Sequence, residues 1–124
     1  MRRTRSGGFS IVEVLAAMTL FAIVATAICT LATTSTRFTI SNRHATAAAM
    51  LAQEELEELR GMAYADVDSR GWLATVGAQD FAVDSVVTVN DPAAGMKRIV
   101  VTVSWIGPEG YHTHELETIF TSLI

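Results

Sequence analysis

A single carboxylate, Glu13, lies at the start of a long apolar segment, Val14 to Ala32, interrupted only by three threonines. A charge at the centre of a membrane-spanning helix costs roughly 2.5–3.5 kcal/mol, and less near its end, so such a carboxylate needs a partner. A cut between Gly8 and Phe9 would create one, because the new α-amine of Phe9 would be largely cationic at neutral pH. One helical turn separates Phe9 from Glu13, so the amine could pair with Glu13 in the same chain or in the next subunit of an assembly.

Two other interpretations of this N-terminus stay open. A secretory signal peptide also has a basic leader and an apolar core, and the leader here contains Arg2, Arg3 and Arg5. Against it, Glu13 stands where the apolar core should begin, and the apolar run is long for a signal peptide. A plain signal anchor would span the membrane too, but it gives Glu13 no purpose.

The apolar segment is long enough to cross a membrane as a helix, because about 20 residues at 1.5 Å each cover a hydrocarbon core of roughly 30 Å. The leader arginines should hold the N-terminus in the cytoplasm and send the C-terminus outward. The transmembrane residues expected from the sequence are Val14, Leu15, Leu20, Phe21, Ile23, Val24, Ile28 and Leu31.

The stretch Gly8-Phe9-Ser10-Ile11-Val12-Glu13 resembles the signature of type IV pilins and pseudopilins. That signature is a short basic leader ending in Gly, then Phe, three mostly apolar or hydroxyl residues, and Glu before a long apolar helix. The resemblance implies that a prepilin peptidase cuts after Gly8 and usually methylates the amine of Phe9. It also implies that Glu13 helps admit the subunit into a filament, by pairing with the Phe9 amine of a neighbour. The partners implied are the peptidase, other pilin or pseudopilin subunits, the inner-membrane assembly platform and membrane lipid.

Composition narrows the class of protein further. The 124 residues leave room for one small domain beyond the helix, and the formal charge of −4 would become more acidic without the leader arginines. An acidic domain argues against direct binding of nucleic acid. Cys29 is the single cysteine, so no intramolecular disulfide can form. Many major pilins resemble one another in a cysteine-bridged loop near the C-terminus, so its absence favours a minor pilin or pseudopilin.

The chain should begin with one long helix over residues 9–60, because that span has no glycine and no proline. We therefore expect a leader over residues 1–8, which is removed, and a transmembrane and assembly half of the helix over residues 9–32. An amphipathic half should follow over residues 33–60, and residues 61–124 should supply the loop and sheet of an outer domain.

The amphipathic half carries apolar residues at helical spacing, which predicts a stripe that packs on the sheet. The acidic run of residues 54–58 is expected to form a solvated face. The stripe consists of Phe38, Ala45, Ala49, Ala52, Leu56 and Leu59.

The remainder predicts a three-stranded antiparallel sheet, with strands over residues 81–89, 97–105 and 111 to about 122. Residues 61–78 are expected to form a loop whose apolar residues Trp72, Leu73 and Val76 anchor it to the core. Alternation predicts that these residues face the helix: Ile99, Val101, Val103, Trp105, Leu116 and Phe120.

The sequence thus predicts an α+β, pilin-like fold, with a long helix packed on a small sheet. The helix end over residues 51–60 and the strand over residues 97–105 are similar to minor pilins of the PilV type and to the I-type minor pseudopilin of type II secretion. This implies a structural subunit in, or at the tip of, a type IV pilus or secretion pseudopilus. The alternative is a monomeric single-pass membrane protein whose outer domain binds a ligand.

No arrangement of catalytic residues, no cofactor and no metal site is expected. His112 and His114 share one side of a strand, but no third ligand stands at a fixed spacing. Asp80 and Asp84 do not fit a calcium-loop motif. We therefore expect no enzyme activity and no metal.

Overall fold

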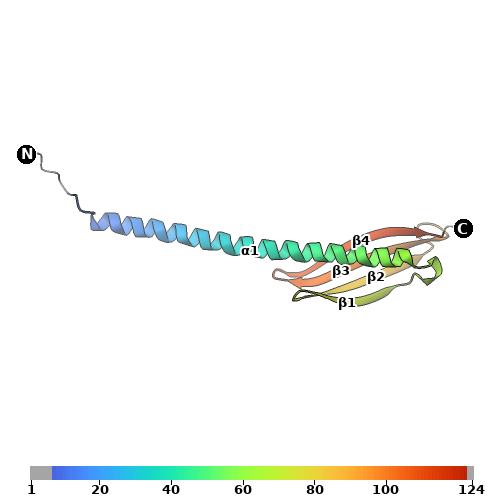
Figure 1. Cartoon of the computed structure of the whole chain (residues 1–124). Helices are drawn as coiled ribbons and strands as arrows, with labels where there is room; N and C mark the ends of the chain where they lie inside the picture. Colours follow the sequence, from blue (N-terminus) through green and yellow to red (C-terminus); the bar gives the residue numbers. More distant parts are fainter. Residues whose placement is uncertain (1–6, 123–124) are drawn as a thin grey trace, which may run out of the picture. The chain divides into compact units, whose positions relative to one another are not determined.

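The computed structural model describes residues 7–122, which form one long helix followed by an antiparallel sheet (Figure 1). The helix α1 spans Ile11–Gly61, and the short 3-10 helix η1 spans Tyr64–Asp66. The chain divides into two compact units, with the boundary between Phe38 and Thr39. The strands are β1 (Arg70–Val76), β2 (Gln79–Val89), β3 (Met96–Gly107) and β4 (Gly110–Thr121).

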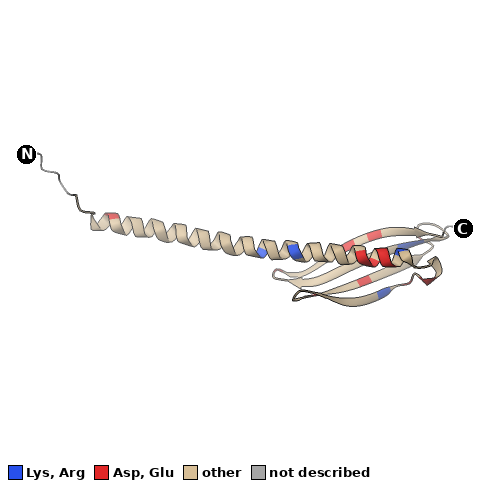
Figure 2. Cartoon of the chain, in the orientation of Figure 1, with Lys and Arg blue, Asp and Glu red and all other residues tan. Residues whose placement is uncertain are grey.

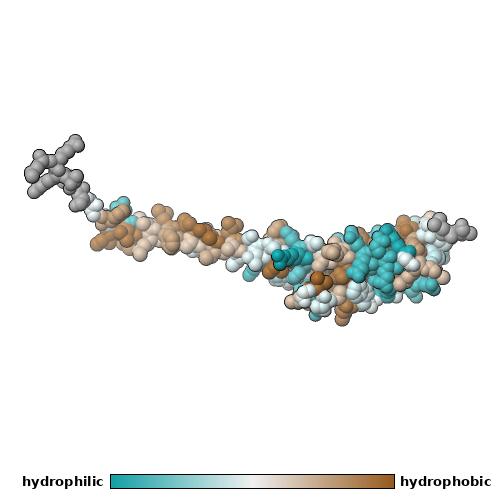
Figure 3. All heavy atoms as spheres, viewed as in Figure 1, coloured by the Kyte–Doolittle hydropathy of each residue, from teal (hydrophilic) through white to brown (hydrophobic). Residues whose placement is uncertain are grey.

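The first unit is helical from Ile11 and exposes its apolar side chains. The most apolar 18-residue window of α1 has a mean hydropathy of 2.4, and none of it is buried within the protein. Figure 3 shows this part of the surface as almost wholly hydrophobic. A helix satisfies its own backbone hydrogen bonds, so a surface of this kind is compatible with hydrocarbon.

The hydroxyl groups in the apolar segment are also satisfied inside the helix. The hydroxyl of Thr19 donates to the carbonyl of Leu15 at 2.8 Å, and that of Thr26 donates to Ala22 at 2.8 Å. Thr30 does the same to the carbonyl of Thr26 at 2.9 Å. These three residues therefore place no unpaired donor in a membrane.

In the second unit, the last turns of α1 cover one face of a four-stranded antiparallel sheet in the order β1-β2-β3-β4 (Figure 1). The register sets Phe81 opposite Trp105 and Val83 opposite Val103, so alternate residues of β2 and β3 face the helix. The buried apolar core consists of Ala48, Leu51, Ala52, Leu56, Leu59, Val67, Phe81, Val83, Ile99, Val101, Val103 and Trp105.

The structure confirms the expected α+β arrangement but corrects the number of strands to four. Residues 70–76, which we expected to lie in a loop, form β1 and pair with β2 from Arg70 opposite Ser85 to Val76 opposite Gln79. The expected anchoring role is wrong for Leu73 and Val76, which are 80% and 45% exposed, whereas the half-exposed Trp72 donates a hydrogen bond to the buried Glu55. An edge strand with one half-covered face lacks the alternation that made β3 easy to predict.

The apolar stripe of the helix is partly as predicted. Ala52, Leu56 and Leu59 are buried, whereas Phe38 and Ala45 are exposed. The buried face of α1 also includes Glu55, which is only 1% exposed. The prediction that residues 54–58 form a solvated face is therefore wrong for Glu55.

Candidate functional site

The expected cleavage site lies in an open stretch immediately before α1. Residues 7–10 have no regular secondary structure, and Phe9 is 81% exposed. A methyl group added to Gly7 or to Gly8 would meet no atom within 4 Å. Packing within the chain therefore does not require glycine at either position, so any requirement for Gly8 must come from another molecule.

Glu13 occupies the first turn of α1, whose first hydrogen bond runs from the amide of Val14 to the carbonyl of Ser10 at 3.1 Å. A carboxylate in this turn interacts favourably with the positive end of the helix dipole. Among residues 7–122, no hydrogen bond or ion pair to the Glu13 side chain is present. Figure 2 shows it as an isolated acidic position, since residues 14–36 carry no charge.

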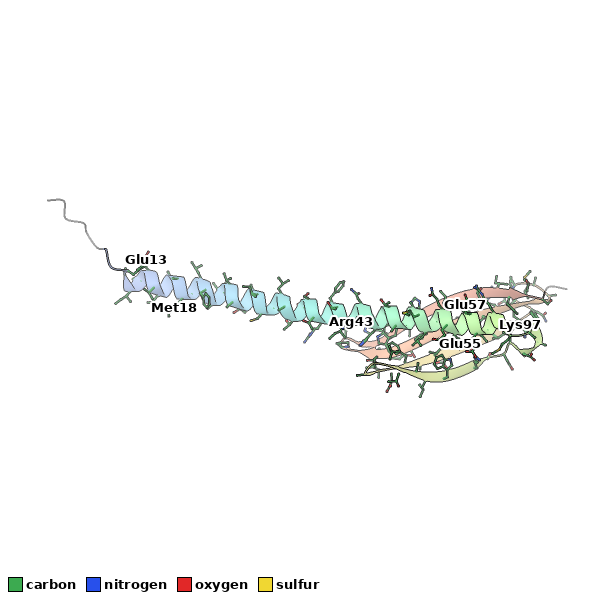
Figure 4. The ribbon with its side chains drawn as sticks, in the orientation of Figure 1. Glu13, Met18, Arg43, Glu55, Glu57 and Lys97 are labelled. Atoms are coloured by element: carbon green, nitrogen blue, oxygen red, sulfur yellow. The ribbon has the colours of Figure 1, made fainter. Side chains whose placement is uncertain are left out.

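The surroundings of Glu13 are apolar. Residues of the same helix face form an open hollow beside it, and Glu13 and Met18 can be located in Figure 4. Such a surface excludes water only when another molecule covers it, and the carboxylate would then need a cation from that molecule. The hollow is lined by Phe9, Glu13, Val14, Ala17, Met18 and Phe21.

The structure leaves the expected partner of Glu13 untested. In the uncut chain the nitrogen of Phe9 belongs to a peptide bond and carries no charge, so the proposed amine does not yet exist. The expected transmembrane residues, from Val14 to Leu31, all lie in α1, and every one of them is exposed within the chain.

The second unit contains a buried carboxylate that the sequence did not reveal. The guanidinium of Arg70 donates to Glu55 through Nε at 2.7 Å and through Nη2 at 3.0 Å. The indole Nε1 of Trp72 donates to the same carboxylate at 2.8 Å. Arg70 also pairs with the exposed Glu58 at 2.9 Å, so one arginine on β1 joins two glutamates on α1.

These contacts shift the pKa values of both partners. Burial alone would raise the pKa of Glu55, but the hydrogen bonds from Arg70 and Trp72 outweigh it and lower that pKa below the ordinary value. The hydrogen bonds to Glu55 and Glu58 raise the pKa of Arg70 above its ordinary value. Both side chains are therefore charged at neutral pH, and they tie the edge strand to the helix.

The spacing of Glu55 could have disclosed its burial. It lies four residues after the buried Leu51 and four before the buried Leu59, so it is on the helix face that meets the sheet. Glu57 lies on the opposite side of α1 and is exposed (Figure 4). The sequence prediction treated Glu55 and Glu57 as parts of one solvated face, although they lie on opposite sides of α1.

A buried lysine holds the connection between α1 and β1. The ammonium of Lys97 donates to the carbonyls of Tyr64 at 2.7 Å and Val67 at 2.8 Å, and it lies 4.7 Å from the centre of the Tyr64 ring. Its three donors thus face two carbonyls and an aromatic ring, which allows a charged group to be buried. This contact fixes η1 against the sheet.

His112, Asp80 and Asp84, which were considered as metal ligands, lie against other groups of the sheet. His112 stacks on Trp105 with ring centres 5.5 Å apart, and the hydroxyl of Thr75 donates to Asp80 at 2.7 Å. Asp84 leans over β1, where a methyl group on Gly71 would come within 2.5 Å of its carboxylate. Among residues 7–122, no group of three or more His, Cys, Asp or Glu residues could hold a metal ion.

Comparison with known proteins gives one match. The family described as Prokaryotic N-terminal methylation motif matches residues 3–28, about a fifth of the chain. No curated protein and no solved structure matches the chain. The matched range contains Gly8, Phe9 and Glu13, and its first residues lie outside those that the structure describes.

Proposed function

We propose that this chain, which carries the prepilin-type cleavage and methylation motif of the type IV pilin and pseudopilin family, is a minor pilin or pseudopilin. It would be a structural subunit, as members of this family are, built into or at the tip of a type IV pilus or a type II secretion pseudopilus. The observation that carries the proposal is the matched motif, in which Glu13, a carboxylate with no partner among the described residues, lies in the first turn of an exposed apolar helix.

The first proposed step is processing by a prepilin peptidase. Gly8 and Phe9 lie outside regular structure with open space around them, which suits entry of the peptide bond into another protein's active site. Cleavage after Gly8 removes the basic leader and converts the amide of Phe9 into an amine, which the same enzyme would methylate. The helix from Ile11 onward is unchanged by this step.

The second proposed step is assembly through Glu13. When the apolar face of α1 is covered by a neighbouring helix, the carboxylate of Glu13 loses water and requires a cation. The amine of Phe9 from an adjacent subunit supplies that cation, and a methylated amine still carries its charge. The inner-membrane assembly platform and the surrounding lipid are the remaining proposed partners.

The proposed location before assembly is the inner membrane, crossed once by the apolar segment. Arg2, Arg3 and Arg5 precede that segment, and residues 14–36 carry no charge. The positive-inside bias then favours a cytoplasmic N-terminus and a second unit outside the cytoplasm.

The mass of the protein recovered from membranes tests the proposal. Loss of residues 1–8, with or without one methyl group on Phe9, is expected. Gly8→Val should leave the full-length chain in the membrane, because a bulky side chain next to the cut blocks the peptidase. Gly7→Val is the matched control, since both positions are equally open and neither change disturbs the fold.

Two results would contradict the proposal. One is a mature mass unchanged by Gly8→Val, which would refute the proposal that a prepilin peptidase cuts after Gly8. The other is a full-length wild-type chain that inserts in the membrane and is never cut in the presence of the peptidase. That outcome would favour the monomeric single-pass protein with a ligand-binding outer domain.

A further inference from the structure

The sheet of the second unit ends in an unpaired edge on the β4 side. The strand order is β1-β2-β3-β4, and β4 pairs with β3 alone (Figure 1). An edge of this kind presents backbone donors and acceptors to which another strand can bind. Edge strands that avoid such pairing usually contain proline, lysine or a bulge. β4 contains no proline and no lysine, and its register with β3 runs without a bulge from Gly110 to Thr121.

The register shows which backbone groups of β4 point to the free edge. The amide of Ser122 donates to the carbonyl of Gly95 at 3.1 Å, so the even-numbered residues of β4 form the hydrogen bonds to β3. In an antiparallel pair these residues alternate with residues whose backbone groups point the other way. Among residues 7–122, no strand or loop forms a hydrogen bond with those backbone groups. They belong to residues with exposed side chains, namely Tyr111, Thr113, Glu115, Glu117, Ile119 and Thr121.

The hydrophobic core is also incomplete along this edge. Ile99, Val101 and Val103 of β3 are fully buried. Leu116 and Phe120 of β4 pack against the same core but are only partly buried. A strand added beside β4 would lie next to these two side chains and remove more of their apolar surface from water. The free edge of β4 therefore offers both backbone hydrogen bonds and apolar contacts to a further strand.

The charges on β4 favour a basic occupant of this edge. Glu115 and Glu117 lie two residues apart on the exposed face of β4, and the strand contains no Lys or Arg. Glu117 pairs with Arg98, whereas Glu115 has no ion pair or hydrogen bond through its side chain among residues 7–122. The second unit as a whole contains more Asp and Glu residues than Lys and Arg residues.

A second copy of β4 fits the same edge poorly. In the antiparallel registers with the greatest overlap, Glu115 would lie opposite Glu115 or Glu117 of the other copy. Like charges directly opposite each other destabilise a pair of strands. The charges therefore favour an occupant that carries cations at the positions where a second β4 would carry carboxylates.

We propose that the free edge of β4 binds an extended segment of another polypeptide in which basic and apolar residues alternate. The segment adds a further strand to the sheet through backbone hydrogen bonds. Its cations lie beside Glu115 and Glu117 on the exposed face, because side chains alternate between the two faces of a strand. Its apolar residues lie beside Leu116 and Phe120 on the other face. This interaction involves the second unit alone, so it goes beyond the proposed cleavage and the proposed pairing of Glu13.

Fluorescence anisotropy of a labelled peptide tests the inference, with the full chain in micelles of an uncharged detergent. The probe is the end-capped peptide Thr-Val-Lys-Val-Lys-Val-Thr, which should bind saturably and more weakly as salt is added. The same peptide with methyl groups on the backbone nitrogens of both lysines keeps its charge but loses the donors that face β4. It should bind several-fold more weakly, and so should a peptide with Glu in place of Lys.

Variants of the protein locate the binding edge. Thr113→Pro removes one backbone donor of the free edge and leaves the hydrogen bonds between β3 and β4 in place, so it should weaken peptide binding several-fold. Thr113→Val is the matched control, because it changes the same side chain and keeps the donor. Glu115→Gln should weaken binding and reduce its dependence on salt. Circular dichroism should show the same folded content in each variant.

Several results would overturn the inference. Absence of saturable binding by the lysine peptide would refute it, and equal binding of the N-methylated peptide would show that charge alone attracts the probe. Equal binding of the glutamate peptide would refute a basic occupant. A dimer of the full chain that Thr113→Pro dissociates would make a second copy the occupant instead. The peptide comparisons need no change in the protein, and none of these results bears on cleavage after Gly8.

Discussion

Glu13 and Glu55 belong to the same helix, yet their surroundings differ in every respect that matters for a carboxylate. Glu55 is buried and accepts hydrogen bonds from Arg70 and Trp72. Glu13 has apolar neighbours and no partner among residues 7–122. Glu55 thus has its partners in the same chain, whereas the described residues provide none for Glu13.

Because of this difference, we expect replacement of Glu13 and replacement of Glu55 to have different effects. Loss of the charge at Glu55 should lower the free energy of unfolding, because the partners of Glu55 are in the same chain. Loss of the charge at Glu13 should impair assembly with other subunits and leave the free energy of unfolding unchanged.

Arg70→Met should have the largest effect on stability. It removes the cation beside Glu55 and leaves a buried carboxylate with Trp72 as its remaining side-chain donor. Removing one partner of a buried ion pair costs about 3–5 kcal/mol, and partial exposure of Arg70 favours the lower end. Chemical unfolding of the full chain in detergent micelles, followed by tryptophan fluorescence, would measure this. A cost no greater than that of Arg60→Met would show that the pair does not tie β1 to α1.

Ala52→Phe should follow, at about 1–3 kcal/mol, because it overpacks a fully buried position between helix and sheet. Glu57→Phe introduces the same side chain on the exposed side of α1 and should matter far less. The same unfolding experiment would compare them. Equal losses of stability would mean that the helix face assigned to the sheet is wrong.

Acidification should weaken the second unit through Glu55. Because the pKa of Glu55 is lowered in the folded state, its contribution is fully present above the ordinary glutamate pKa and is lost as the pH falls below it. Unfolding free energies of the wild type and of Glu55→Gln, measured from neutral pH down to about pH 3, should therefore converge on acidification. Parallel curves would indicate that Glu55 is not the group responsible.

Arg60→Met should have the smallest effect. Arg60 pairs with Glu57 at 3.4 Å, and both side chains are largely exposed. Exposed pairs contribute about 0–1 kcal/mol, and salt screens them. A loss of stability comparable with that of Arg70→Met would remove the distinction between buried and exposed charges on this helix.

Local sequence patterns predicted the elements whose formation depends on residues close together in the sequence. The alternation of Ile99, Val101, Val103 and Trp105 predicted the buried face of β3, and all four are buried. The absence of glycine and proline predicted the long helix, since nothing interrupts its backbone hydrogen bonds.

Features that depend on distant residues were not predicted. β1 exists because Arg70 reaches across to Glu55 and its backbone pairs with β2, and neither fact is visible in the exposed residues of the strand itself. The spacing of Glu55 from Leu51 and Leu59 indicates its burial, but its partner Arg70 lies 15 residues away and was not predicted. For Glu13, residues 7–122 contain no partner, and we propose that the partner is the Phe9 amine of another subunit.

The most direct test of the account is Glu13→Gln, which keeps the size of the side chain and removes its charge. Cleavage after Gly8 should persist, membrane insertion should persist or improve, and the unfolding free energy of the second unit should not change. Site-specific cross-linking near Phe21 to partner pilin or pseudopilin subunits should be lost, because no carboxylate remains to receive the amine of a neighbour. Cross-linking at the wild-type level would contradict the central claim that Glu13 is a charge reserved for another subunit.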